Sequence, residues 1–188
     1  MLIKMKVAGL TIDPLTNTPI VILKDMDEKK AIPIWIGLFE ASAIATELEK
    51  ITFSRPMTHD LIYEILKAVD VEVIQIEIHD LRNNTFFANV HLLRSGKTIV
   101  VDSRPSDAIA LALRANAPIY VDEKVIEKSR NVDFGKKIAD LDTLKDDKLD
   151  MAKRHLRISS SWKRTKIKPS GNRHSILPRK DKIEEIAY

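Results

Sequence analysis

The chain contains no cysteine, which excludes disulfide bonds, thiolate catalysis and cysteine-bound zinc together. No apolar run approaches the roughly 18 residues that a membrane-spanning helix needs, so an integral membrane protein is not expected. The N-terminal residues MLIKMKVAGLTID interleave charged and apolar side chains, and no signal peptide is predicted. These absences favour a cytoplasmic protein.

Several common catalytic motifs are also missing. The sequence has no H-E-x-x-H zinc motif, no G-x-S-x-G nucleophile turn and no dinucleotide-binding glycine fingerprint. The stretch SGKT at 95–98 imitates the end of a phosphate-binding loop, but His91 stands where the first glycine is required. It also joins two predicted strands, so we interpret it as a turn.

Charge is divided unevenly along the chain. Residues 1–152 hold 20 Lys and Arg against 24 Asp and Glu, a net charge of −4. Residues 153–182 hold 11 Lys and Arg and one acid, Asp181. An acidic body therefore carries a basic tail, and such tails favour polyanions because neutralising phosphates releases condensed counterions.

Hydrophobic periodicity predicts an α+β fold. Alternating apolar residues predict strands at 2–12, 20–24, 30–36, 71–80, 85–93, 97–102 and 117–122. Helical spacing predicts helices at 38–50, about 59–69 with Thr58 as N-cap, and 105–115. The order strand–strand–strand–helix occurs twice, which indicates an internal duplication packed as a compact layered domain.

The character of the sequence changes near residue 130. Residues 129–152 are rich in charged residues and have apolar residues at helical spacing. Residues 153–188 are rich in Ser, Pro, Gly and basic residues and show no hydrophobic period. We therefore predict a domain at 1–128, a charged helical extension at 129–152 and a basic flexible tail at 153–188.

Four separated blocks carry a family resemblance: PIWIGLFEASAIA, RPMTHDL, TFFANVHL and DSRPSDAIALALRANAPIYV. In that order they closely resemble the bifunctional nuclease (BFN, DUF151) domain family, over about residues 2–128. The resemblance implies a compact oligomeric α/β domain that degrades both DNA and RNA. It implies no assigned catalytic residues.

The strongest candidate site lies where a predicted strand meets helix 105–115. Asp102, Arg104 and Asp107 would gather two carboxylates and a guanidinium near a helix N-terminus, which favours an anion. Asp102 and Asp107 would be the metal ligands there; no pattern identifies a cofactor, and a divalent ion such as Mg²⁺ would serve this arrangement. The alternative is ordinary helix initiation, with Pro105 in the first turn and Asp107 complementing the helix dipole.

A second junction repeats the first. Arg55-Pro56 followed by Asp60 echoes Arg104-Pro105 followed by Asp107, and His59 adds a general acid or base. If the two junctions face each other, these groups would form one catalytic cluster; otherwise they are two helix starts. Glu40 is a further candidate, although a first-turn acid explains it as well.

Other candidates are weaker. Trp35 would stack a base or lie in the core or a subunit interface. His79 and His91 would approach each other as metal ligands or lie on the plain sheet surface. In the tail, we expect basic side chains and one aromatic side chain to contact nucleic acid: Lys153, Arg154, Arg157, Trp162, Lys163, Arg164, Lys166 and Lys168.

Two functions follow from these observations. The first is a nuclease that hydrolyses the phosphodiester bonds of DNA and RNA with low sequence specificity, acting as a homo-oligomer without a membrane. The second is a non-catalytic, oligomeric nucleic-acid-binding or regulatory module, which suits an acidic body.

Overall fold

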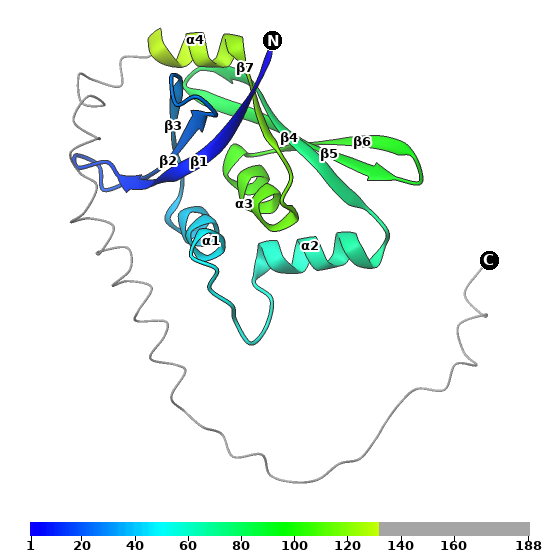
Figure 1. Cartoon of the computed structure of the whole chain (residues 1–188). Coiled ribbons are helices and arrows are strands. Elements are labelled where there is room, and N and C mark those ends of the chain that lie inside the picture. Colours follow the sequence, from blue (N-terminus) through cyan, green and yellow to red (C-terminus); the bar gives the residue numbers. More distant parts are fainter. Residues whose placement is uncertain (132–188) are drawn as a thin grey trace, which may run out of the picture. The chain divides into compact units, whose positions relative to one another are not determined.

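Residues 1–131 are described by the computed structural model, within the first of two units into which the chain divides, 1–151 and 152–188. The elements are β1 (Leu2–Ile12), β2 (Pro19–Asp25), β3 (Ala31–Trp35), α1 (Leu38–Leu48), α2 (Thr58–Ala68), β4 (Glu72–Arg82), β5 (Thr85–Arg94), β6 (Lys97–Ser103), α3 (Pro105–Ala115), β7 (Ile119–Asp122) and α4 (Glu123–Asn131). The predicted α+β class is confirmed (Figure 1). No helix of this part of the chain is long and apolar enough to cross a membrane.

One seven-stranded sheet has the order β3-β2-β1-β7-β4-β5-β6. The antiparallel meanders β1–β3 and β4–β6 flank β7, which pairs antiparallel with β1 and parallel with β4. Each meander is followed by a helix, α1 or α3. This arrangement agrees with the predicted duplication of a strand–strand–strand–helix unit.

The sheet curls around α3, with α1 and α2 on the same side (Figure 1). Ala108, Ile109, Ala110 and Ala112 of α3 are fully buried. The small alanines let the helix approach the strands and its neighbouring helices closely, and the core gathers around it. Burial of α3 thus explains why residues 107–114, DAIALALR, are mostly apolar.

Two expectations need correction. Thr58 is the first residue of α2, and the N-cap is Met57, because the extended backbone ends one residue earlier than expected. The α4 helix at Glu123–Asn131 was not predicted; its buried Val125 and Ile126 are too few to give a clear helical period. Most of the predicted extension at 129–152 and all of the tail at 153–188 lie outside the described residues.

Candidate functional site

Charged side chains from α1, α2 and α3 form a connected group, which we call the helix-start cluster: Glu40, His59, Arg104 and Asp107. Asp107 Oδ1 lies 3.0 Å from His59 Nε2, and its Oδ2 accepts a 2.7 Å bond from Arg104 Nε. Arg104 Nη1 lies 2.8 Å from Glu40 Oε1. A single guanidinium therefore joins two carboxylates, and one of these also holds an imidazole.

Local sequence places each member of the cluster. Arg104 is the N-cap of α3 with extended backbone, and Pro105 follows it at the first helical position. Asp107 and Glu40 stand in the first turns of α3 and α1, where the helix dipole favours a carboxylate. Gly37 precedes α1, and a Cβ there would overlap with Glu40 Oε2. The absence of a side chain at Gly37 thus leaves room for the Glu40 carboxylate.

The electrostatics of the cluster hold Asp107 ionised. Partial burial raises the pKa of Asp107, but hydrogen bonds from Arg104 and His59 outweigh burial and bring the pKa below its ordinary value of 3.8. The hydrogen bond to Asp107 raises the pKa of Arg104. The His59 side chain is largely buried, whereas Arg104 is exposed. A fixed imidazole thus lies beside a solvent-facing guanidinium.

Arg114 is a buried cation that the sequence analysis missed. Its side chain is only 5% exposed, and its Nε donates to Asp60 Oδ1 of α2. Its Nη1 donates to the carbonyl oxygens of Ala43 in α1 (3.1 Å) and Ala110 in α3 (2.9 Å). One guanidinium therefore ties the three helices together. The available signal was a lone arginine in an apolar helix, two turns after Asp107 and so on the same face.

Asp60 completes this tie and fixes the start of α2. Its Oδ2 accepts a 2.9 Å bond from the Met57 backbone N–H. Partial burial raises the pKa of Asp60, but the Arg114 guanidinium and the Met57 N–H outweigh it, and the net pKa is lowered. His59 is the neighbouring residue, so the Asp60–Arg114 pair also positions His59 against Asp107.

Asp102, the strand residue of the predicted site, lies apart from the cluster. Asp102 pairs with Asn89 across β5 and β6, between the buried Ala88 and Val90. Because side chains alternate along a strand, Asp102 lies on the sheet face opposite α3. It makes no ion pair within residues 1–131. Arg55 is exposed in the loop before α2.

The two strand histidines do not form the pair considered above. His91 lies opposite Gln75, and its Nε2 is 3.2 Å from Glu77 Oε2. Trp35 is partly buried and donates to Asp13 Oδ2. Within residues 1–131 no group of three or more His, Asp or Glu is arranged to hold a metal ion. In the cluster, Glu40 and Asp107 face a guanidinium, so this donor set does not fit a metal.

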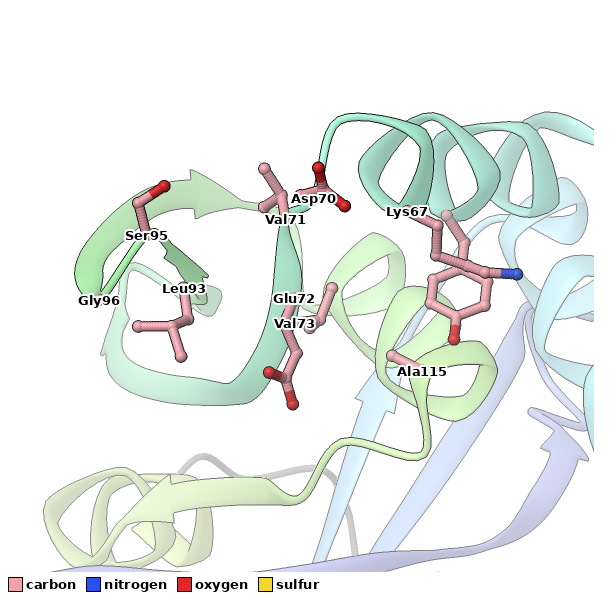
Figure 2. Close-up of a pocket in the computed structure, with 10 residues that line it drawn as sticks. Lys67, Asp70, Val71, Glu72, Val73, Leu93, Ser95, Gly96 and Ala115 are labelled. Carbon is pink, nitrogen blue, oxygen red and sulfur yellow. The ribbon is translucent and has the colours of Figure 1, made fainter.

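A pocket of about 600 Å³ lies at the other end of α2 (Figure 2). Its lining comes from the end of α2, the start of β4 and the β5–β6 turn, and includes Lys67, Asp70, Glu72, Ser95 and Ala115. Ala115 ends α3, whereas Asp107 stands in its first turn, about 12 Å away along the axis. The pocket is therefore separate from the helix-start cluster.

Comparison with known proteins gives consistent matches. The sequence model of the bifunctional nuclease domain matches residues 21–133. An uncharacterized protein of Mycobacterium tuberculosis is 37% identical over 126 residues, which cover 67% of this chain and 75% of that protein.

Two rice proteins are more distant. Bifunctional nuclease 1 of Oryza sativa subsp. japonica is 25% identical over 97 residues, 50% of this chain and 29% of the relative. Bifunctional nuclease 2 of the same subspecies is 25% identical over 117 residues, 60% of this chain and 36% of the relative. The family match at residues 21–133 includes α1, α2 and α3, from which the helix-start cluster is built.

Proposed function

Because the chain belongs to the bifunctional nuclease domain family, we propose that it hydrolyses phosphodiester bonds of DNA and RNA with low sequence specificity. The names of the rice relatives support nuclease activity. The observation that carries the proposal is the His59–Asp107–Arg104 arrangement, which combines a fixed imidazole with an exposed cation.

His59 is the proposed proton-transfer group. Asp107 Oδ1 accepts a hydrogen bond from His59 Nε2, and this bond orients the ring. With the Nε2 proton directed to Asp107, Nδ1 of the neutral ring is the proton acceptor. His59 would take a proton from water as the water oxygen bonds to phosphorus. The bond from phosphorus to the leaving sugar oxygen would break, and that oxygen would take up the proton from the imidazolium or from solvent, so that the products are a phosphate monoester and a sugar hydroxyl.

Arg104 is the proposed phosphate contact. Its guanidinium is held by Glu40 and Asp107 but remains exposed, so it can bind a phosphate oxygen in a fixed orientation. Negative charge accumulates on the non-bridging oxygens during attack, and a preorganised cation stabilises that charge. Arg55, exposed before α2, would add a second cation where the polymer passes.

The proposed nucleophile is water. DNA lacks the 2′-hydroxyl that RNA offers as an internal nucleophile, so a single mechanism for both polymers excludes that group. An external water serves both polymers, and its deprotonation is the role assigned to His59. No step of this proposal passes through a metal ion, because Asp107 is paired with Arg104 and Asp102 lies on the opposite face of the sheet.

The test is a cleavage assay with the purified full chain on single-stranded DNA, RNA and duplex DNA, with and without EDTA. We expect cleavage of all three polymers and a loss of at least about 100-fold in His59→Gln, because general acid–base catalysis contributes about 10²–10⁴-fold. Asp27→Asn, in the exposed β2–β3 turn, is the control. Wild-type rates in His59→Gln would remove the imidazole from the mechanism.

The basic tail is proposed to supply polymer affinity. Its lysines and arginines would contact phosphates, and Trp162 would stack on one nucleobase, in both cases without sequence preference. Since the acidic body repels a polyanion, the tail would offset that repulsion. Removal of residues 153–188 should therefore weaken binding far more than it changes turnover of bound polymer.

A non-catalytic nucleic-acid-binding module is the alternative, and one observation favours it. Every charged group of the cluster has a partner of opposite charge or a hydrogen bond, as a purely structural cluster would. This alternative predicts binding by the full chain, loss of binding on truncation at 152, and no cleavage above a matched preparation of His59→Gln.

We also propose that the chain acts as a homo-oligomer, as the family resemblance implied. Large apolar side chains are exposed on two described elements: Leu61, Ile62, Ile65 and Val69 on or next to α2, and Ile99, Val100 and Val101 on β6. Contiguous apolar surface on a globular domain is typical of an interaction site. Sedimentation of the full chain tests this point independently of cleavage.

A further inference from the structure

We infer that the free edge of β6 is the surface at which a second copy of this chain binds, by antiparallel β6–β6 pairing centred on Val100. This inference rests on the proposed self-association and not on the proposed cleavage. Its starting observation is that β6 closes one end of the sheet and hydrogen-bonds only to β5 among the described strands.

The two edges of the sheet differ in protection. At the other edge, β3 has five residues with Pro33 in the middle, and a proline there removes a backbone donor. The β6 edge has seven residues without proline, and its register with β5 is continuous, without a bulge. Folded proteins usually blunt such an edge, so an unprotected one indicates a partner strand.

The side chains of β6 are exposed on both faces of the sheet. Ile99 and Val101 are each 44% exposed, and they lie opposite Leu92 and Val90 on the face that carries α3. Val100 is 53% exposed on the other face, opposite His91. Figure 1 shows the β5–β6 hairpin extending beyond α3. An added strand would cover apolar side chains on both faces at once.

Symmetry and charge favour a second copy as the occupant. A two-fold axis perpendicular to the sheet places the same face of both copies on the same side. Residues that oppose each other then share a face, and since alternate residues of a strand share a face, their numbers are both odd or both even. Centring the axis on Val100 pairs all seven residues: Val100 with itself, Ile99 with Val101, Thr98 with Asp102, and Lys97 with Ser103. No like charges oppose each other, and Thr98 can donate to Asp102, so the strand is self-complementary.

This pairing also gives Asp102 a role away from the helix-start cluster. Its carboxylate lies on the face opposite α3 and would accept a hydrogen bond from the partner's Thr98. The two sheets would join into one continuous sheet of fourteen strands across the axis. Both helix-start clusters would then lie on the same face of that sheet, where one polymer can reach both.

The absence of cysteine allows a direct test in the full chain. In Val100→Cys, opposed Cα atoms would lie about 4.5–5.5 Å apart, within the range that a disulfide spans. We expect most of the protein to form a covalent dimer of twice the 21.4 kDa chain mass under mild oxidation. Asp27→Cys controls for random collision, because it lies in the exposed β2–β3 turn.

Ile99→Cys sets the register. In this variant the two substituted positions of the dimer would lie diagonally across the axis, about 7–8 Å apart, which is too far for an unstrained disulfide. It should therefore not crosslink alone but should crosslink when mixed with Val101→Cys. Efficient crosslinking of Ile99→Cys alone, or none in Val100→Cys while wild type sediments as an oligomer, would overturn the β6 interface.

A charge pair tests the same axis without oxidation. Val100→Lys and Val100→Glu each place like charges at the two-fold axis, so each alone should raise the dissociation constant of the dimer more than about tenfold. An equimolar mixture should restore the dimer. Circular dichroism checks that both variants are folded. Sedimentation of wild type as a monomer at all concentrations, or of either variant as an unweakened dimer, would refute the proposal, whatever the cleavage assay shows.

Discussion

Replacing Asp60 by asparagine removes the counter-charge of the buried Arg114 and keeps the shape of the side chain. Asparagine can still accept the Met57 N–H, so the substitution isolates the charge from the helix cap. Removing one partner of a fully buried ion pair lowers the free energy of unfolding by about 3–5 kcal/mol. Asp60 is 31% exposed, and Arg114 keeps two carbonyl acceptors, so we expect about 2–3 kcal/mol of destabilisation.

The assay is thermal unfolding followed by circular dichroism. For the 131 described residues the unfolding entropy is roughly 0.28 kcal/mol/K, so this loss corresponds to a Tm lowered by about 7–11 °C. Asp27→Asn breaks only an exposed ion pair with Lys29 and should lower the Tm by less than about 2 °C.

A double-mutant cycle with Arg114→Met separates the pair from general damage. Both single variants disturb the same contact, so the double variant should be more stable than their added effects predict by about 1.5–2.5 kcal/mol. Additive losses, or a Tm of Asp60→Asn equal to that of Asp27→Asn, would refute the claim that this pair holds the three helices.

The pKa of Asp60 and of Asp107 is lowered on folding, so their stabilising contribution is present above the ordinary value of 3.8 and is lost as pH falls through the lowered pKa. The stability gap between wild type and Asp60→Asn should therefore be full at pH 7 and should narrow as pH falls below 3.8, and a gap independent of pH in thermal melts would contradict this. Asp107→Asn should reduce cleavage by at least about 100-fold, whereas Asp102→Asn, on the opposite sheet face, should reduce it less than about threefold; equal losses in initial-rate assays would favour the two-carboxylate site expected from the sequence. Truncation after residue 152 should weaken binding to single-stranded DNA at least about tenfold and flatten the dependence of log K on log salt, as measured by fluorescence anisotropy; an unchanged slope would show that the tail makes no phosphate contacts.

The sequence predicted the elements better than their contacts. Helix 105–115 was placed without error because Pro105 marks its start and its apolar run is continuous. Strand 2–12 followed from alternation of apolar residues, strand 97–102 from its β-branched run after a turn, and the duplication from element order. These signals are local, since they depend on neighbours within a few residues.

The site could be predicted only in part. His59 and Asp107 were both candidates, and their contact joins residues 48 positions apart. Arg114 was not predicted because its partner Asp60 is 54 positions away; its spacing from Asp107 indicates the helix face but not the partner. The side that Asp102 faces depends on the register of β5 with β6, which local periodicity does not determine.

The central claim is that one reaction centre, built around His59 and Asp107, cleaves both polymers. Its most direct measurement is the initial cleavage rate of wild type and Asp107→Asn on single-stranded DNA and RNA of the same sequence. Both rates should fall by the same factor, about 100-fold or more, because both substrates use the same water and imidazole. Unchanged rates, or a loss confined to one polymer, would contradict a shared centre at the helix-start cluster.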